Sequence, residues 1–418
     1  MQDFSVTAVK MTMLKTLTLL KSPISLQEQR KLFSLAEAEG IELSKVLEQY
    51  GYSFNDLVYY NSHTKEWGNC SPKLLSDYQA KENGIPMVSF FTGCGGIDLG
   101  FEAAGYNHIA AFEFNELFCK TLRKNRPSWE IFGPPTHSGN VSKLDEVIST
   151  LEDMIPKNFE GIFTGGPPCQ PFSIASNQRF AKFGDNFKRV GFKHATNGNL
   201  LFDYINIIEH FMPACFLIEN VPGLRDLDGG KQLAEAIRDL ERTGYIVDEP
   251  MILNAVDYGV PQFRERLFVI GFRNGQTPLY PKPAEMRYGA GSVLHRNQNN
   301  GQNAETRIHK LGSVQRYCQL DYGQRDQLSR VDRLDPCTPS KTVIAGGTNG
   351  GGRSHLHPEI PRTLSVRECA RLQTFPDDYI FVGPTARQFT QVGNAVPPVL
   401  AAQLGLSLAA SVFRTKKK

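Results

Sequence analysis

Short apolar runs alternate with amphipathic stretches through the middle of the chain. The apolar runs are bounded by Gly, Pro or polar residues and have the length and character of buried strands. They lie at 87–91, 109–112, 161–164, 215–218 and 267–271. Helical periodicity lies between most of these runs, for example over 201–211 and 231–243. Strands that alternate with helices predict an α/β fold built on an open, mostly parallel sheet.

Two regions depart from this alternation. Residues 1–84 carry a helical pattern over 26–49 that Gly40 interrupts, followed by a polar stretch at 77–84 that reads as a linker. We expect a small helical appendage, although the spacing also fits a helix-turn-helix DNA reader. Residues 274–361, the inserted segment, are rich in Gly, Asn, Gln and Arg and predict a smaller, irregular domain. The sequence thus divides into an N-terminal appendage at 1–84, a catalytic domain at 85–273, the inserted segment at 274–361 and a returning segment at 362–418.

Composition narrows the class of protein. A chain of 418 residues is long enough for about two to three domains. Its formal net charge of +3, from 46 Lys and Arg against 43 Asp and Glu, is too close to balance to identify a partner. No apolar run reaches 18 residues and the N-terminus is a poor secretory signal, so we expect a cytosolic protein that does not span a membrane. Eight Cys show no C-x-x-C pair or zinc spacing, so we expect neither a metal site nor disulfides.

A glycine turn follows the first predicted strand and opens a helix. Phe91 to Gly96 place small residues where the backbone can approach a ligand and where a helix N-terminus offers free amides. Glu113 lies 20 residues after Gly93, at the end of the next strand, where an acidic side chain can hold two ribose hydroxyls. A plain tight turn beside an exposed carboxylate is the alternative. The G-x-G-x-x-G spacing of dinucleotide-binding proteins is absent from this turn.

Three prolines surround one cysteine at the end of a later strand. The segment Gly165-Gly166-Pro167-Pro168-Cys169-Gln170-Pro171 follows the strand at 161–164, so Cys169 is expected at the carboxyl edge of the sheet. A thiolate nucleophile needs a fixed position and a lowered pKa, and rigid flanks supply the first. The alternative is a buried cysteine with no chemical role.

Further polar groups are expected at the same edge. Glu219 ends the strand at 215–218, where partial burial would raise its pKa and let it donate a proton. Arg264 and Arg266 precede another strand and point to one side of an extended chain, where they could hold a phosphate or a carbonyl oxygen. A turn-capping glutamate and a surface salt-bridge ladder are the alternatives. The turn at 391–398, which includes Asn394, is by itself only a helix cap.

Taken together and in this order, these segments resemble the DNA (cytosine-5) methyltransferases. The resemblance covers about 86–273 and 362–413. It rests on the glycine turn, Pro-Pro-Cys-Gln, Glu-Asn-Val, Gln-x-Arg-x-Arg, the segment Arg367 to Pro376 and the Gly393-Asn394 turn. It implies a Rossmann-like fold that uses S-adenosylmethionine, with the inserted segment as the target-recognition domain.

The resemblance also implies roles for individual residues. Cys169 is the nucleophile, Glu219 holds the target cytosine at N3 and its amino group, and Arg264 and Arg266 contact the cytosine carbonyl and its backbone. The residues implied to bind the cofactor are Phe91, Gly93, Gly95, Gly96, Glu113, Phe114, Asn140, Val141, Pro168, Leu201, Asn394 and Ala395. Those implied to bind DNA are Gln170, Ser173, Arg179, Lys182, Lys188, Arg189, Lys193, Thr342 and Arg353.

Two positions depart from the family pattern. Ser89 stands where many relatives have Asp, and Asn140 stands where an Asp usually meets the adenine amino group. Asn140 can still accept that hydrogen bond through its carbonyl oxygen. The long basic loop at 174–199, with one acid at Asp185, fits closure over a base flipped out of the duplex.

Other functions remain open at this stage. A tRNA cytosine-5 methyltransferase shares the motifs, although the long inserted segment favours duplex DNA. A silent DNA-binding regulator and a nicotinamide oxidoreductase are further alternatives. The resemblance implies a monomer in the bacterial cytoplasm, associated with the nucleoid, that acts on double-stranded DNA in a restriction–modification system with a separate restriction endonuclease. Because residues 1–84 lie outside the motifs, we expect their deletion to preserve methylation.

Overall fold

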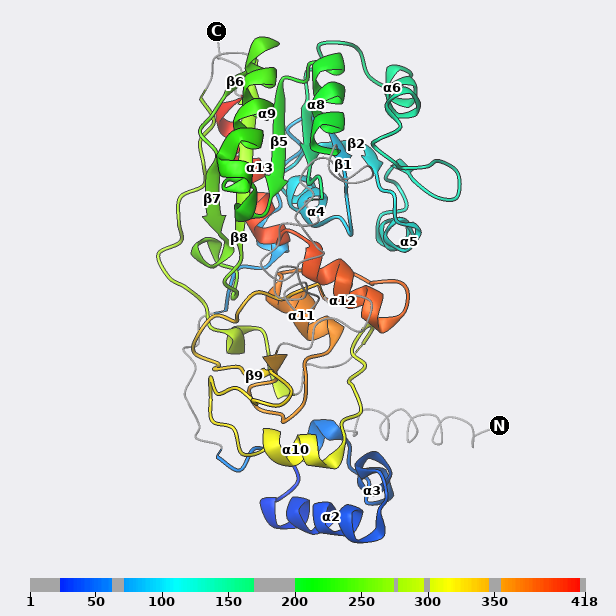
Figure 1. Cartoon of the computed structure of the whole chain (residues 1–418), viewed down its shortest axis with the longest axis vertical. Helices are drawn as coiled ribbons and strands as arrows, with labels where there is room; N and C mark the ends of the chain where they lie inside the picture. The colour runs from blue at the N-terminus through cyan, green and yellow to red at the C-terminus, as the bar shows by residue number, and fades with distance from the viewer. Residues whose placement is uncertain are drawn as a thin grey trace, which may run out of the picture.

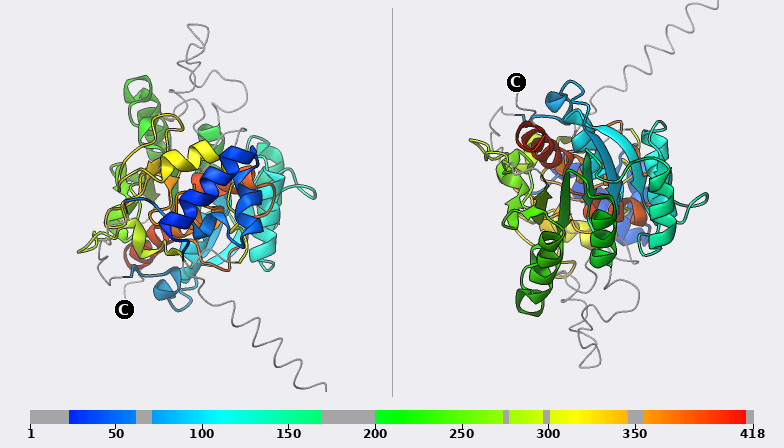
Figure 2. Two further views of the ribbon diagram at one scale, coloured as in Figure 1. Left: turned by 90° about the horizontal axis from the view of Figure 1, so that it is seen from below. Right: turned by 90° about the horizontal axis from the view of Figure 1, so that it is seen from above.

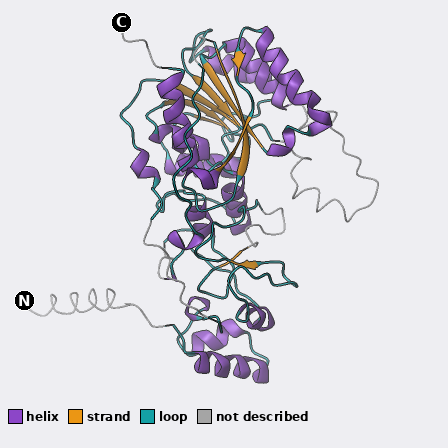
Figure 3. Cartoon of the chain, turned by 90° about the vertical axis from the view of Figure 1, so that its left-hand side faces the viewer, coloured by secondary structure: helices purple, strands orange, loops and turns teal. Residues whose placement is uncertain are grey.

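A mixed eight-stranded sheet forms the centre of the upper part of the molecule in a computed structural model (Figures 1 and 3). The model describes residues 23–61, 71–168, 200–273, 277–296, 301–345 and 355–413. The strand order is β3-β2-β1-β4-β5-β8-β6, and β7 also pairs with β8. The strands are β1 (Pro86–Phe90), β2 (Asn107–Phe112), β3 (Ile131–Phe132), β4 (Ile162–Gly165), β5 (Cys215–Asn220), β6 (Ile246–Val247), β7 (Met251–Asn254) and β8 (Glu265–Phe272).

The pairing matches the expected fold class. Strands β1 to β5 pair in parallel, whereas β8 runs antiparallel to β5, β6 and β7. The predicted alternation of strands and helices is confirmed, with the ends of the five predicted strands displaced by no more than two residues. The α/β methyltransferase class inferred from the motifs is therefore confirmed.

Helices cover both faces of the sheet. The described helices are α2 (Leu26–Glu39), α3 (Leu43–Gln49), α4 (Gly96–Ala103), α5 (Glu116–Asn125), α6 (Leu144–Glu152), α8 (Leu200–Phe211), α9 (Lys231–Arg242), α10 (Leu311–Tyr317), α11 (Val366–Leu372), α12 (Thr385–Asn394) and α13 (Pro398–Ser411). Alternate strand residues point to opposite faces. Met87 of β1 packs in a core with α4 and α13, whereas Val88 and Phe90 pack in a second core with α6, α8 and α9.

The returning segment completes the first of these cores. The Tyr106 hydroxyl donates to the carbonyl of Gly405 in α13 at 3.0 Å. A Cβ on Gly100 of α4 would lie 2.4 Å from the Cβ of Ala401, so only glycine lets the two helices approach this closely. Residues more than 280 positions apart in the sequence thus share one core.

The N-terminal helices pack on the inserted segment at the lower end of the molecule (Figures 1 and 2). Ser25 caps α2 through a bond from Glu28 N–H, and Gly40 ends the helix with φ 64°, which explains the interruption in the pattern. Leu32 and Phe33 of α2 share a buried cluster with Val314 of α10. The appendage is confirmed as helical.

The stretch expected as a linker also contacts the catalytic domain. Leu75, in a short 3₁₀ helix (Leu75–Tyr78), is buried in the α4–α13 core. The N–H of Ala80 donates to the carbonyl of Ala103 at 2.8 Å, and the N–H of Asn83 donates to Gly105. The stretch at 77–84, expected as a linker, is mostly exposed and is tied by these backbone bonds to the end of α4 and to the residue pair that follows it.

Among the described residues, one helical stretch is long and apolar enough to cross a membrane. Thr385–Ser411 has a mean hydropathy of 1.3 over the tested window, and 67% of that window is buried inside the molecule. It comprises α12 and α13, separated at Ala395–Pro397. Its apolar side chains are buried in the core with α4 and α11, so we interpret it as a pair of core helices.

Candidate active site

The carboxyl ends of β4 and β5 bring two of the predicted motifs together. After β4 the chain turns at Gly166, and a Cβ there would lie 2.8 Å from Oε2 of Glu219. Nδ2 of Asn220 donates to the carbonyl of Pro167 at 3.1 Å. The end of β5 therefore holds the turn that leads to Cys169, which itself lies outside the described residues.

Glu219 forms an ion pair with Arg266 at this edge. Nε of Arg266 lies 2.8 Å from Oε1 of Glu219, and each side chain is only 13% exposed. The antiparallel register sets Glu219 opposite Phe268, which makes Arg266 its diagonal neighbour across the strand pair. Burial raises the pKa of Glu219, although the charge of Arg266 opposes that shift. The arrangement can hold a polar ring edge with one carboxyl group.

Arg264 is bonded to backbone carbonyls and not to the Glu219–Arg266 pair. It is 1% exposed, its Nη2 donates to the carbonyl of Gly393 at 2.8 Å, and its Nη1 donates to the carbonyl of Val343 at 3.3 Å. The expectation that Arg264 contacts the cytosine is thus corrected. Its donors are occupied by backbone carbonyls because two distant segments fold over it.

The glycine turn lies against the end of β2. Gly93 has φ 61°, and its N–H donates to Oε2 of Glu113 at 2.7 Å, while the N–H of Asn115 donates to Oε1 at 2.6 Å. Among the described residues, a Cβ on Gly93 would meet nothing closer than the Phe91 carbonyl oxygen at 3.9 Å, so this part of the structure leaves room for a ligand above the turn. Burial raises the pKa of Glu113 to about 7, although the backbone N–H groups oppose that shift.

Other expected cofactor residues surround this opening. Phe91 adopts φ 53°, an uncommon conformation for a side chain of this size, and its ring lies edge-on to that of Tyr204. Phe114, directly after Glu113, is 68% exposed, which leaves an aromatic face available for stacking. Gly95 caps α4 with φ 78°, and a Cβ on Gly96 would lie 3.1 Å from the Cβ of Ala395.

The remaining expected cofactor residues differ in their surroundings. Val141 and Leu201 are buried in the core of the α6–α8 face, whereas Pro168 and Asn394 are exposed. Oδ1 of Asn140 accepts from both the N–H and the hydroxyl of Ser142, at 3.1 and 2.9 Å. This oxygen therefore serves a local turn, and a contact between Asn140 and an adenine amino group stays a prediction.

Most of the expected DNA contacts cannot be placed. Gln170, Ser173, Arg179, Lys182, Lys188, Arg189, Lys193 and Arg353 lie outside the described residues. Thr342 is described and partly buried, and its hydroxyl donates to the carbonyl of Phe263 at 2.7 Å. The inserted segment thus meets the Gln-x-Arg-x-Arg motif directly.

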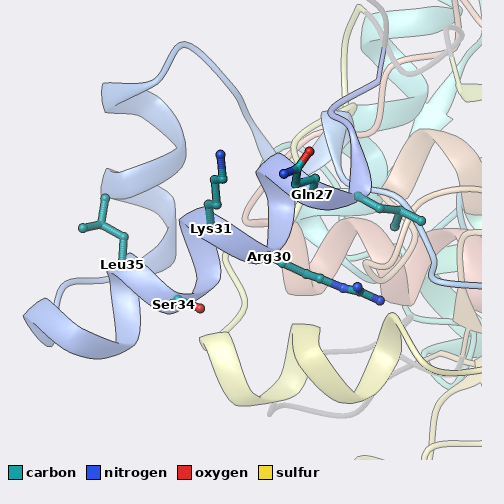
Figure 4. Close-up of a pocket in the computed structure, with 6 residues that line it drawn as sticks. Gln27, Arg30, Lys31, Ser34 and Leu35 are labelled. Carbon is teal, nitrogen blue, oxygen red and sulfur yellow. The ribbon is translucent and has the colours of Figure 1, made fainter.

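Two buried glutamines were not assigned roles from the sequence. Gln262 and Gln373 are fully buried, and Nε2 of Gln262 donates to Oε1 of Gln373 at 3.0 Å. Both residues lie within motif segments, but nothing in a sequence pattern marks a glutamine as buried. A hollow of about 760 Å³ beside α2 contains none of the predicted residues; it is lined by Leu26, Gln27, Arg30, Lys31, Ser34 and Leu35 (Figure 4).

Comparisons with known proteins agree with these motifs. The model of the C-5 cytosine-specific DNA methylases matches residues 85–288 and 282–410. The type II methyltransferase M.NgoFVII of Neisseria gonorrhoeae is 32% identical over 362 residues, covering 80% of this chain and 89% of that protein. The type II methyltransferase M.MthTI of Methanothermobacter thermautotrophicus is 33% identical over 352 residues, covering 77% and 96%.

Solved structures share the fold at lower identity. An E. coli prophage-encoded protein assigned as a DNA modification methyltransferase superposes with a TM-score of 0.63 at 22% identity, over 79% of this chain and 100% of that one. The Entamoeba histolytica methyltransferase EhMeth gives a TM-score of 0.55 at 16% identity, over 78% and 98%. Given the extent of the family match and the identity to the curated relatives, this chain belongs to the C-5 cytosine-specific DNA methylases and is a DNA (cytosine-5) methyltransferase.

Proposed function

We propose that this enzyme methylates C5 of a cytosine within a specific duplex DNA sequence, through covalent addition of Cys169 to a flipped-out base. The observation that carries the proposal is the Glu219–Arg266 pair at 2.8 Å, which lies against Gly166 three residues before Cys169. A carboxyl group, a guanidinium and the backbone that leads to a thiol meet at one edge of the sheet.

Cys169 supplies the nucleophile in this mechanism. Its thiolate forms a bond to C6 of cytosine, and the electron pair of the C5–C6 double bond moves into the ring, which makes C5 electron-rich. C5 would then use this electron pair to bond the methyl group that the cofactor supplies. Loss of the C5 proton to a base would afterwards provide the electrons that re-form the C5–C6 double bond, as the sulfur leaves as a thiolate. Both ends of the cycle need a good sulfur nucleophile and leaving group.

Glu219 stabilises the negative charge that develops on the ring. A carboxyl group that keeps its proton can donate it toward N3 as Cys169 adds, and burial favours that protonated form. Arg266 fixes the position of the carboxyl group through its Nε and can present its remaining donors to the cytosine carbonyl oxygen.

The family implies S-adenosylmethionine, and the residues beside the glycine turn fit it. The open space over Gly93 would take the part of the cofactor that lies against the backbone. The buried carboxylate of Glu113 would hold the ribose, and the exposed ring of Phe114 would stack on the adenine. When bound, S-adenosylmethionine supplies an electrophilic methyl group. The turn at Asn394 and Ala395 would close the pocket against Gly96.

The basic loop at 174–199 and the inserted segment would bind the DNA. Flipping a base costs a few kcal/mol, which phosphate contacts and loop closure can offset. The relatives are named type II methyltransferases, and we propose the corresponding role here: protection of host DNA from a separate restriction endonuclease. Bisulfite sequencing of a plasmid from cells that express the enzyme would identify the methylated site.

A covalent trap tests the mechanism. Duplex DNA with 5-fluorocytosine at the identified site should form an adduct with the wild-type enzyme and cofactor, because fluorine blocks loss of the group at C5. Cys169→Ser should form no adduct and transfer no tritiated methyl groups, whereas the exposed Cys337→Ser should behave as wild type. Methylation by Cys169→Ser near the wild-type rate would remove Cys169 from the mechanism. Transfer to tRNA but not to duplex DNA would favour the tRNA alternative.

A further inference from the structure

Three buried polar side chains join segments that lie far apart in the sequence. Gln262 and Gln373 are 0% exposed and Arg264 is 1% exposed. Oε1 of Gln262 accepts from the N–H of Val343 at 2.7 Å, and Nη1 of Arg264 donates to the carbonyl of the same residue at 3.3 Å. Val343 of the inserted segment is thus held at both its backbone groups.

The same side chains hold the turn between α12 and α13. Nη2 of Arg264 donates to the carbonyl of Gly393 at 2.8 Å. Nε2 of Gln373, itself bonded to Gln262, donates to the carbonyls of Val392 and Ala395 at 2.7 and 3.3 Å. Arg264 therefore bridges directly from the inserted segment to the turn, and the two glutamines form a second bridge.

Close packing links this turn to both of its neighbours. A Cβ on Gly393 would lie 2.3 Å from the N of Ala345, so the inserted segment presses on one side of the turn. A Cβ on Gly96 would lie 2.3 Å from the carbonyl oxygen of Val396, so α4 presses on the other side. Gly96 begins α4 directly after the glycine turn that opens over Gly93. Because the backbone is in close contact on both sides of the turn, a shift of residues 343–345 toward the turn would press it against the start of α4.

We propose that Arg264, supported by Gln262, is a positioning residue that couples DNA binding by the inserted segment to closure of the cofactor pocket. The inference rests on the proposed function, in which the pocket beside Gly93 takes S-adenosylmethionine and the inserted segment binds DNA. Arg264 is suited to this role because two of its donors grip two different segments. Its buried Nε has no hydrogen-bond partner among the residues that the structure describes, a donor that a second arrangement of the neighbouring carbonyls could satisfy.

Coupling of this kind is measured as a ratio of affinities. S-adenosylhomocysteine binds the same pocket without reacting, so calorimetry can measure its dissociation constant with and without saturating duplex DNA that carries the methylation site. We expect DNA to tighten binding by about 5–150-fold in the wild-type enzyme. By reciprocity, S-adenosylhomocysteine should tighten DNA binding by the same factor.

Arg264→Lys keeps the charge but cannot reach both carbonyls, so it should reduce the ratio to within about threefold of one. Gln262→Met removes the bond to Val343 N–H while keeping the shape of the side chain, and it should lower the ratio as well. Arg333→Lys is the matched control, because Arg333 is also 1% exposed and bonded to backbone carbonyls, but those carbonyls belong to Pro358, Leu320 and Asn61 and not to the turn between α12 and α13. It should leave the ratio unchanged even if it lowers the melting temperature.

Each outcome decides the inference. A wild-type ratio near one overturns it, and so does a normal ratio in folded Arg264→Lys; if that variant does not fold, a normal ratio in Gln262→Met overturns it. Equal loss in Arg333→Lys would show that the effect is general destabilisation and would also overturn it. If the wild-type enzyme transferred no methyl groups to DNA, the proposed function itself would fail, whereas normal transfer with unaltered ratios would remove only the coupling role.

Discussion

The carboxyl group of Glu219 is subject to two opposing influences. Burial favours its neutral form, and Arg266 at 2.8 Å favours its charged form. Burial has the larger effect, so the group keeps a proton at a higher pH than an exposed glutamate does. A carboxyl group that holds its proton more tightly is better suited to donate it toward N3 of cytosine.

Replacing Glu219 by Gln should therefore separate catalysis from cofactor binding. Gln keeps a hydrogen-bond donor but supplies no proton to N3, so we expect turnover to fall by roughly 10²–10⁴-fold. The dissociation constant for S-adenosylmethionine should change less than about threefold, since Glu219 lies at β5 and not beside Gly93. Tritiated methyl transfer and calorimetry measure the two quantities, with the exposed Glu265→Gln as the control. Lost cofactor affinity with normal turnover would show that Glu219 belongs to the cofactor site and not to the cytosine site.

Glu113 should make cofactor binding depend on pH. Its pKa is raised from an ordinary value of 4.5 to about 7 by burial. Two ribose hydroxyls would donate to the ionised form and lower that pKa, so binding should release a proton below pH 7 and strengthen as the pH rises to about 7. Calorimetry at pH 6 in buffers of different ionisation enthalpy measures the release. Glu113→Gln should abolish it, and the exposed Glu116→Gln should not. Equal release in Glu113→Gln would contradict the assignment.

The same shift affects stability with the opposite sign. Between pH 4.5 and about 7 the folded chain holds the Glu113 proton more tightly than the unfolded chain does. The contribution of this group to the free energy of unfolding therefore falls as the pH rises through that range. Glu113 is thus retained at a cost to the stability of the protein without cofactor.

Among the elements, the inserted segment depends on helices that precede the catalytic core. Arg296 donates to the carbonyls of Asn55 and Leu57, and the ring of Tyr59 lies 3.5 Å from the guanidinium carbon of Arg333. Val314 of α10 is buried against α2 and α3. The two regions therefore form one packed unit, although more than 200 residues separate them in the sequence.

The DNA sequence specificity should be transferable to a relative only when this packed unit is moved as a whole. If the inserted segment reads the DNA, grafting residues 274–361 together with 23–61 into a relative of different specificity should move methylation to this enzyme's site, as mapped by bisulfite sequencing. Grafting 274–361 alone should yield an unstable protein, because Val314 and the donors of Arg296 lose their partners. An active chimera of the longer kind that keeps the recipient's site would show that specificity lies elsewhere.

At the scale of the whole molecule, the N-terminal helices are a structural part of the enzyme. Within 23–61 there are six acidic residues and three basic ones, which disfavours a phosphate-binding role for a helix-turn-helix reader. The Tyr59 hydroxyl donates to the carbonyls of His357 and Ile360 at 2.7 and 3.2 Å. These contacts change the expectation that residues 1–84 can be deleted without loss.

Deletion of residues 1–61 should give an insoluble or strongly destabilised protein. A milder test is Tyr59→Leu, which removes both hydrogen bonds and the ring under Arg333 and should lower the free energy of unfolding by roughly 2–4 kcal/mol. Denaturant unfolding measures the change, and Tyr50→Leu at a half-exposed site is the control. A soluble deletion protein with normal activity would restore the original expectation.

Local sequence patterns determined the strands, the fold class and the positions of the chemical groups at the sheet edge. The apolar runs became β1, β2, β4, β5 and β8, and Glu219 lies at the carboxyl end of β5, the strand that was expected to present it. These features depend on the period of a strand and on the rigid chemistry of Gly and Pro, which act over a few residues. The motif order was enough to indicate the family.

Tertiary structure alone decided which groups are available for binding. Arg264 and Arg266 lie two residues apart and share a charge, yet one is bonded to two backbone carbonyls and the other pairs with Glu219. The difference arises because Val343 and Gly393, from remote parts of the chain, close over Arg264. Burial and hydrogen-bond partners depend on contacts between such distant segments, and the spacing of residues along a sequence does not contain that information.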